Sequence, residues 1–274
     1  GGQTLADMTA LKMGGYTDLP QVALDQIALN IVPCIGHPNP EIRDGLVYET
    51  YAQFLRKDAL STDTKIKLFK DILAQFSTPE DPTSFTRPFA ALDLSELVRA
   101  DRIHAYLSDE QRENLVNATA GYLTKITDYR GFSDTEGWRH GIAHASDLVL
   151  QMTLNPKIND QQIETLRAAL STQIAPDSGH AYIHGESERL ARPILYMARR
   201  GTFTAKNWQD WTKTLIDPAP FSSWNDMYTS EKGLAKLHNT KALLNTLYIN
   251  ANESQDDNVK RLFPAVRDAL FKLP

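Results

Sequence analysis

The sequence is poor in several features on which protein functions commonly depend. Cys34 is its only cysteine, so an intrachain disulfide, a cysteine-based zinc cluster and a Cys-x-x-Cys redox centre are excluded. Cys34 stands in an apolar run, where a buried structural thiol is expected. No run approaches the roughly 18 apolar residues that a membrane span needs. We therefore expect no membrane-spanning segment.

Common enzyme signatures and a surplus of positive charge are also missing. There is no glycine-rich phosphate loop, no dinucleotide-binding fingerprint and no Gly-x-Ser-x-Gly nucleophile elbow. The 34 acidic residues outnumber the 29 Lys and Arg residues, and the net charge of −5 argues against broad binding to a nucleic-acid backbone. The only dense basic group is formed by Arg189, Arg192, Arg199 and Arg200, and a solvated helix face is its more common interpretation. We expect no nucleic-acid partner.

The first residues are Gly-Gly-Gln, without a methionine. A removed secretory leader and the remnant of a tag are both ordinary causes of such a start. We favour export to the periplasm, with the cytoplasm as the alternative. The sequence does not indicate an oligomeric state.

Helical periodicity, in contrast, is present along nearly the whole chain. Between Leu19 and Ile35 the apolar positions recur at steps of three and four residues. His37-Pro38-Asn39-Pro40 breaks that pattern, and a new helix starts at once. Further helices are predicted after Ser61 and over about 88–104, 108–126, 134–155, 159–173, 187–200, 204–215, 229–250 and 256–271. No segment shows a convincing alternation of period two, so the chain is predicted to be all-α.

The connections between these helices are short, which indicates how the helices pack. Short loops between paired helices favour an α/α superhelix, a HEAT-like α-solenoid of antiparallel helix pairs. The proline-rich turn before residue 41 resembles a HEAT-type turn, and Arg43-Asp44 resembles the pair that links adjacent units of that type. Asp217-Pro218-Ala219-Pro220 is the best internal break, and we interpret 217–226 as a long connection. A single helical-repeat domain over 1–274 is predicted.

Two histidines and two carboxylates are concentrated around residues 137–147. We predict that Asp134 caps one helix through this stretch and that the helix ends near Asn155. On a helical wheel the core face consists of Trp138, Ile142, Ala145, Val149 and Met152. A polar stripe opposite that face would consist of Glu136, His140, His144, Asp147 and Gln151.

Three interpretations of this stripe stay open. His140 and His144 can bind one divalent cation, with Asp147 as a further ligand, although the spacing is not the zincin signature. Without metal, a histidine beside a carboxylate is a competent general base. The structural interpretation is that the stripe packs on a neighbouring helix, with each histidine hydrogen-bonded to a carboxylate. No cofactor is predicted, and a divalent metal is the less favoured alternative.

A second polar cluster lies at 177–189. Gly179 and Gly185 favour a loop that contains His180 and His184. The next helix is expected to open with Glu186, Glu188 and Arg189, where acidic residues suit the helix dipole. Capping and ion pairing is the structural interpretation of this cluster. In a solenoid it would instead form the wall that faces residues 137–147.

Several motifs together resemble one bacterial family, known as domain of unknown function 2785, over about residues 15–250. The motifs are Phe85-x-Arg87-x-Phe89, Tyr129-Arg130-Gly131-Phe132, Gly137-Trp138-x-His140-x-x-Ala143-His144-x-x-Asp147 and Gly185-Glu186-x-Glu188-Arg189-Leu190. The resemblance implies an all-helical body and no particular activity. It marks as matching positions Trp138, His140, His144, Asp147, Glu186, Glu188 and Arg189. Ala145-Ser146 stands where a Gly-Ala pair is expected, which leaves the polar residues unaffected.

These observations lead to one leading hypothesis and two alternatives. The leading hypothesis is a helical-repeat protein that binds a small polar ligand or a peptide in a concave polar cleft. Its ligand-binding residues would be Glu136, Trp138, His140, His144, Asp147, His184, Glu186, Glu188 and Arg189. The alternative is a hydrolase with His140, His144 and Asp147 as catalytic candidates, and the third hypothesis is a purely structural interaction scaffold. The sequence does not decide whether the chain is an enzyme.

Overall fold

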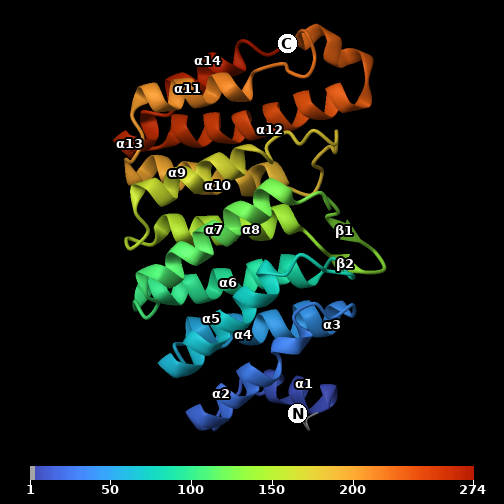
Figure 1. Ribbon diagram of the computed structural model, residues 1–274, viewed down its shortest axis with the longest axis vertical. Coiled ribbons are helices and arrows are strands. Elements are labelled where there is room, and N and C mark those ends of the chain that lie inside the picture. The colour runs from blue at the N-terminus through green and yellow to red at the C-terminus, as the bar shows by residue number, and fades with distance from the viewer. Residues whose placement is uncertain (1–3) are drawn as a thin grey trace. The chain divides into compact units, whose positions relative to one another are not determined.

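The computed structural model describes residues 4–274, and these are almost entirely helical (Figure 1). The chain divides into two compact units, each described by itself below. Unit 1 contains the residues up to Ala118 together with Arg130–Lys157. Unit 2 contains Thr119–Tyr129 together with Ile158–Pro274. The prediction of an all-α chain is confirmed.

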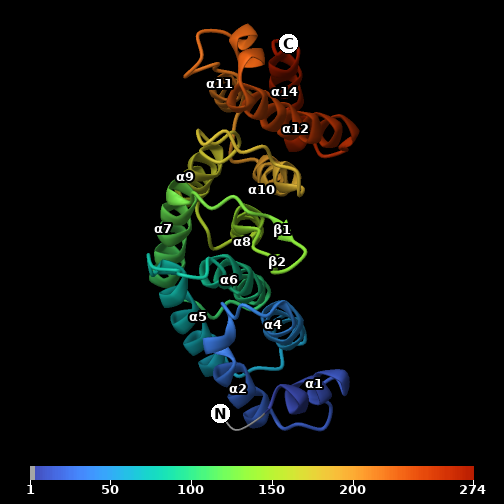
Figure 2. The ribbon, with the colours of Figure 1, turned by 90° about the vertical axis from the view of Figure 1, so that its right-hand side faces the viewer.

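Unit 1 consists of helices in two layers and one short hairpin. Figure 2 shows α4, α6 and α8 in one layer and α2, α5 and the start of α7 in the other. The helices of the unit are α1 (Leu5–Met13), α2 (Gln21–Asn30), the 3-10 turn η1 (Val32–Cys34), α3 (Pro40–Ile42), the π-helix η2 (Arg43–Tyr48), α4 (Glu49–Arg56), α5 (Thr62–Ser77), α6 (Thr86–Ile103), the start of α7 (Asp109–Lys125) and α8 (Gly141–Leu154). The hairpin pairs β1 (Phe132–Ser133) with β2 (Gly137–Trp138).

Helix α6 is the centre of unit 1, since it packs against α4, α5 and α8. Its apolar residues Leu94 and Leu97 are completely buried. The buried carboxylate of Asp101, near its end, accepts hydrogen bonds from the Arg112 guanidinium, from the amide of Asn155 and from the backbone N–H groups of Tyr106 and Leu107. Burial alone would raise the pKa of Asp101, but these hydrogen bonds outweigh it and lower the pKa. This carboxylate therefore ties the end of α6 to the start of α7.

Arg43 joins the N-terminal part of unit 1 to the hairpin. Its side chain is completely buried, and its Nη1 donates to the carbonyl oxygens of His37 (3.0 Å) and Pro38 (3.2 Å). Its Nη2 donates to the carbonyl oxygens of Glu136 (2.9 Å) and Trp138 (3.2 Å). A planar guanidinium has five N–H donors, so this one side chain can donate to all four carbonyl oxygens.

The charge of Arg43 is balanced and its flat face is covered. Asp44 forms an ion pair with Nη2 at 2.9 Å. The guanidinium lies 4.0 Å from the ring centroid of Phe85, and the guanidinium of Arg139 lies 4.1 Å from the same centroid. The ring of Phe85 is thus in cation–π contact with two arginines. The sequence-based interpretation of Arg43-Asp44 assigned the pair a role between repeats, whereas the structure uses Arg43 to hold the hairpin.

Unit 2 is a second group of helices in which α12 is the longest. Besides the end of α7 its elements are α9 (Asp160–Ser171), α10 (Glu186–Arg200), α11 (Ala205–Leu215), the 3-10 helix η3 (Trp224–Thr229), α12 (Glu231–Glu253), α13 (Asp257–Lys260) and α14 (Phe263–Leu270). Helix α12 packs against α10, α14 and η3. Trp208 and Trp211 are buried in the core, and their rings meet edge to face at 5.5 Å.

Several predicted boundaries agree with these helices, and others do not. Ser61 caps α5, as predicted, and 217–223 forms an irregular connection before η3. Helix α1 was not predicted, and the single helix expected over 256–271 is interrupted between α13 and α14. Cys34 is half-buried rather than buried. No helix among residues 4–274 combines the length and apolar character needed to cross a membrane.

Replacing Arg43 with methionine should strongly destabilise the protein. Methionine keeps much of the apolar stem but leaves four carbonyl oxygens and the Asp44 carboxylate without their buried donor. We expect Arg43→Met to lower the free energy of unfolding by about 3 kcal/mol or more, measured by urea denaturation. Arg267→Met, at a partly exposed arginine paired with Asp268, is the control and should change stability by about 0.5 kcal/mol or less. Equal effects of the two substitutions would contradict the assigned role of Arg43.

Candidate functional site

The stretch 137–147 is not one helix, and the predicted start of the helix is wrong. Residues 132–138 form the hairpin, and α8 begins only at Gly141. Asp134 therefore caps no helix, and Glu136 and His140 do not share a helical face with His144. The end of the helix near Asn155 is confirmed. The core face is confirmed for Ile142, Ala145, Val149 and Met152, which are buried, but it is wrong for Trp138, which lies in β2 and is exposed.

The hairpin forms because of its turn and its glycines. Phe132 pairs with Trp138 and Ser133 with Gly137, around a polar turn at 134–136. Gly137 has a φ of 73°, and a Cβ there would meet Pro40 at 3.1 Å and Arg43 at 3.3 Å. The aromatic residues flanking a polar turn that ends in glycine are the signal that sequence analysis missed.

The structure brings Trp138, His140 and His144 together into one array. The rings of Trp138 and His140 stack with centroids 4.6 Å apart and an interplanar angle of 19°. The rings of His140 and His144 are 5.8 Å apart at 61°. His140 precedes α8 with a φ of 53°, a left-handed conformation that is unusual for a residue other than glycine. This backbone reversal places the imidazole of His140 between the indole and His144.

His144 is buried, contrary to the prediction of a polar stripe opposite the core face. Its side of α8 packs on α6, and its ring meets that of Phe89 edge to face at 5.0 Å. Its Nδ1 lies 3.2 Å from the carbonyl oxygen of Pro88. Because a carbonyl oxygen only accepts, this hydrogen bond assigns the proton of the ring to Nδ1. His144 thus packs on a neighbouring helix, as the structural interpretation expected, but this hydrogen bond is to a backbone carbonyl oxygen and not to a carboxylate.

The two predicted carboxylates stand on different elements, Glu136 just before β2 and Asp147 on α8. Glu136, in the hairpin turn, receives two hydrogen bonds from the guanidinium of Arg139, at 2.7 and 3.1 Å, and this lowers the pKa of Glu136. Asp147 is half-buried on α8 and contributes to raising the pKa of Tyr48, a shift that comes mainly from burial of the phenol. Gln151 is half-buried one turn further along α8.

The residues predicted at 180–189 belong to unit 2. Gly179 and Gly185, with φ of 79° and 84°, confirm the predicted loop, and α10 begins at Glu186 as expected. Glu186 is buried, and its carboxylate accepts from the backbone N–H of His184 at 2.9 Å. The Nδ1 of His184 lies 3.7 Å from the same carboxylate. Glu188 is exposed and Arg189 is half-buried. That this cluster faces residues 137–147 stays a prediction.

The chemistry of the donor groups bears on the metal hypothesis. Among residues 4–274, no group of three or more His, Cys, Asp or Glu side chains is arranged to hold a metal ion. His140, His144 and Asp147 are part of that range, and the left-handed turn at His140 removes the helical spacing on which the hypothesis depended. A divalent metal at these residues stays a prediction.

A buried carboxyl group on α6 escaped the sequence analysis. Asp93 is completely buried, and neither of its carboxyl oxygens has a hydrogen-bond partner among residues 4–274. Burial is the main cause that raises its pKa well above the usual value, and the negative charges of Glu96 and Asp44 add to it. The group therefore stays protonated to a higher pH than an exposed carboxyl group does. The only feature of the sequence that could have indicated a buried carboxyl group is an acidic residue within an otherwise apolar helical face.

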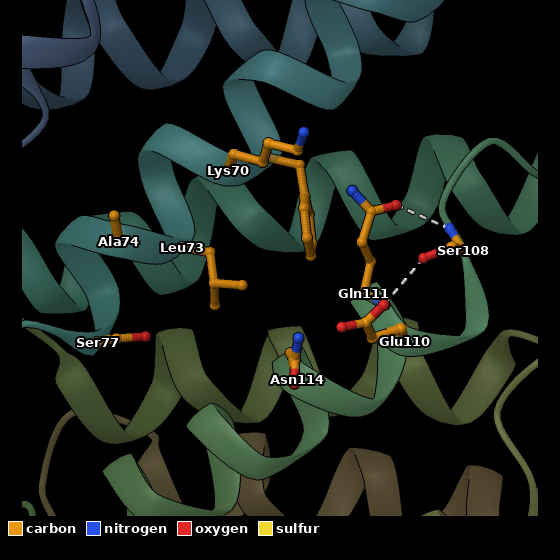
Figure 3. A pocket seen from close by; sticks show the side chains of 9 residues that line it. Lys70, Leu73, Ala74, Ser77, Ser108, Glu110, Gln111 and Asn114 are labelled. Atoms are coloured by element: carbon orange, nitrogen blue, oxygen red, sulfur yellow. Dashed lines mark hydrogen bonds between the residues drawn. The ribbon is translucent and has the colours of Figure 1, made fainter.

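A groove in unit 1 lies between α5 and α7, away from these residues (Figure 3). It has a volume of about 570 Å³ and an apolar floor that includes Phe69 and Leu73. Figure 3 shows Leu73 directed into the space between the two helices and Gln111 hydrogen-bonded to Ser108 in a helix cap. None of the residues that line this groove belongs to the predicted site.

The fold and these side chains define an all-α protein in which a hairpin carries an aromatic and histidine array onto a buried helix. The chain belongs to the family described as "Protein of unknown function (DUF2785)", whose model matches residues 68–249. This match includes 137–147 and 180–189, and it confirms the resemblance drawn from the motifs.

Two further comparisons add little. A crystal structure of an engineered protein is similar with a TM-score of 0.43 and 11% sequence identity, covering 88% of this chain and 97% of that chain. A likeness at that level supports no conclusion about function. No curated protein matches the chain.

Replacing His144 with alanine should reduce stability through lost packing. The substitution removes the contact with Phe89 and the hydrogen bond to Pro88. We expect His144→Ala to lower the free energy of unfolding by about 2 kcal/mol, which corresponds to a melting temperature lower by roughly 5 °C. His104→Ala, at an exposed histidine, is the control and should leave the melting temperature nearly unchanged. A thermally unaltered His144→Ala protein would refute the structural role of the ring.

Asp93 should make stability depend on pH in a specific direction. In the unfolded chain its carboxyl group ionises near the usual pKa of 3.8, whereas in the folded protein it stays protonated to higher pH. Folding then takes up a proton, so the free energy of unfolding falls as pH rises above about 4, by about 1.4 kcal/mol per pH unit until the folded-state pKa is reached. Asp93→Asn removes this contribution.

The measurement is urea denaturation of both proteins at a series of pH values. We expect the two proteins to be similarly stable below about pH 4 and Asp93→Asn to become progressively the more stable as pH rises. A constant difference across the pH range would show that Asp93 ionises normally in the folded protein.

Proposed function

We propose that this chain is a binding protein for a small polar ligand or a short peptide, and that the hairpin with the start of α8 contacts that ligand. One observation carries the proposal, namely the exposed aromatic pair on the hairpin. Phe132 and Trp138 are 46% and 37% exposed, and their rings are 5.0 Å apart. Aromatic side chains with one apolar face and little freedom of rotation are favoured contacts at binding surfaces.

The way in which the pair is held supports a recognition role. The imidazole of His140 stacks on the face of the Trp138 indole that is turned away from solvent, and this contact fixes the orientation of the indole. The backbone of the hairpin is fixed in turn by Arg43, which donates to the carbonyl oxygens of Glu136 and Trp138. A contact surface whose conformation is set before binding loses less entropy when a ligand arrives.

Polar groups around the pair suit a polar ligand. The carboxylate of Glu136 is 47% exposed, although paired with Arg139, and can accept from a ligand amine or amide. His140 has a left-handed backbone conformation that costs of order 1 kcal/mol, and such strained conformations occur often at functional sites. The proposal retains Glu136 and Trp138 from the predicted ligand-binding set and gives His140 and His144, which are both buried, a supporting role beneath them.

The hydrolase alternative receives less support from the same geometry. A general base must come within hydrogen-bond distance of the proton that it removes, and His144 is buried between α8 and α6 with Nδ1 directed to Pro88.

The architecture also remains a proposal. The two helical layers of unit 1 are compatible with an α-solenoid of antiparallel helix pairs, and we propose this fold together with a single domain over 1–274. Such an array would present the hairpin on one of its surfaces.

The test is a comparison of wild type, Trp138→Ala and Phe271→Ala in ligand screening by thermal shift. The probes are free amino acids, dipeptides and nucleosides, which combine polar groups with a planar or apolar part. We expect at least one probe class to raise the melting temperature of wild type, with its affinity reduced about tenfold or more in Trp138→Ala. Phe271, 79% exposed and on a different element, is the matched control and its variant should bind like wild type.

Two results would overturn the proposal. One is a ligand that binds Trp138→Ala as tightly as wild type. The other is the absence of any shift across all probe classes, which would favour the scaffold hypothesis instead.

A further inference from the structure

We propose a second binding site, in unit 2, for a neutral polyhydroxylated ligand of the size of a mono- or disaccharide. The site is an open groove of about 710 Å³ between the segment 124–129, which includes the last two residues of α7, and the segment 172–178, which follows α9. All of the groove belongs to unit 2. None of its lining residues is among the predicted site residues, so the inference is independent of the function proposed for the hairpin.

The polar groups of the groove are mostly hydroxyls. Its rim carries the hydroxyls of Thr124, Thr127, Thr172 and Ser178. The hydroxyls of Thr124 and Thr172 donate to the carbonyl oxygens of Ala120 and Ala169 and can still accept, and the hydroxyl of Thr127 can donate as well as accept. The rim therefore suits a ligand that also offers both kinds of group at many positions. Sugars and other polyols have that property, whereas a phosphate or a carboxylate offers acceptors alone.

The charges that line the groove cancel. Lys125 and Asp177 are its charged residues, one of each sign. Neither sign of ligand charge is therefore favoured over the groove as a whole, and a neutral ligand loses no more than its own hydration on binding. This distinguishes the groove from an anion site or a cation site.

The side chain of Gln173 has a buried acceptor that a ligand could satisfy. Its side chain is 4% exposed, and its Nε2 donates to the carbonyl oxygen of Leu123 at 2.5 Å. That bond fixes the amide, because a carbonyl oxygen requires the NH₂ group on its side. The Oε1 is then buried, and no donor among residues 4–274 reaches it. An unpaired buried acceptor costs about 1–3 kcal/mol, so a ligand hydroxyl that donates to it is stabilised.

Tyr129 provides the apolar surface that a sugar ring needs. Its ring stacks on that of His180 with centroids 5.6 Å apart and an angle of 21°, and its hydroxyl donates to the carbonyl oxygen of Ile126 at 3.1 Å. These two contacts fix the ring at the groove, where Ile126 and Pro176 extend the apolar wall. The C–H faces of a sugar pack on such a wall while its hydroxyls meet the rim.

The experiment uses the whole chain and NMR titration of its backbone amide resonances. The probes are glucose, N-acetylglucosamine, maltose and inositol, with glucosamine and gluconate as charged counterparts. We expect at least one neutral probe to bind in the millimolar range or tighter and to shift the resonances of Thr127, Thr172 and Ser178. Gluconate and glucosamine should bind more weakly than the neutral probes.

Variants then assign the binding to the groove. Tyr129→Ala removes the apolar wall and should weaken binding of the same probe about tenfold or more. Tyr228→Ala, at a 56% exposed tyrosine outside the groove, is the matched control and should bind like wild type. Gln173→Met removes the buried acceptor and should also weaken binding. If Gln173→Met does not fold, the comparison of the two tyrosine variants still decides.

Three results would overturn the inference. These are an absence of shifts at the groove with every neutral probe, tighter binding of a charged counterpart, and a Tyr129→Ala protein that binds like wild type. Trp138→Ala should retain the sugar binding, so a failure of this inference is distinct from a failure of the function proposed for the hairpin.

Discussion

The buried guanidinium of Arg43 is the interaction on which the candidate site of unit 1 depends. A single planar cation donates to carbonyl oxygens on both sides, at His37 and Pro38 before the π-helix and at Glu136 and Trp138 in the hairpin. Segments more than 90 residues apart in sequence are joined in this way. Burying an unpaired charge would be prohibitive, but Asp44 balances the charge and Phe85 covers the flat face. The position of Trp138, and through it that of His140, follows from this one contact.

The helices could be predicted from the sequence because their signals are local. Ser61 capping α5, the apolar face of α8 and the glycines around 179–185 each act within a few residues. The hairpin could not be predicted in the same way, since helical periodicity continues from Trp138 into α8 and the competing cause is distant. Arg43 and Pro40, far away in sequence, select the extended backbone and the glycine at 137. The burial of His144 and the raised pKa of Asp93 are likewise set by packing on and within α6.

The histidine pair has a different meaning once its surroundings are known. Spacing alone suggested two equivalent imidazoles on one face of a helix. In the structure the two rings have different environments, because His140 lies outside the helix against an indole and His144 lies inside against Phe89. The ring of His140 supports the exposed Trp138, and the ring of His144 packs in the core between α8 and α6. The family match includes both residues.

Arg43 holds the hairpin by carbonyl oxygens, and every residue has a carbonyl oxygen. The hydrogen bonds from Arg43 therefore depend on the backbone of Glu136 and Trp138 and not on their side chains. Only Gly137 between them is closed to substitution, because a side chain there would strike Pro40 and Arg43. The side chains at positions 136 and 138 can thus change without loss of the hydrogen bonds that hold the hairpin. The support of the hairpin is thereby separate from the chemistry that its side chains present.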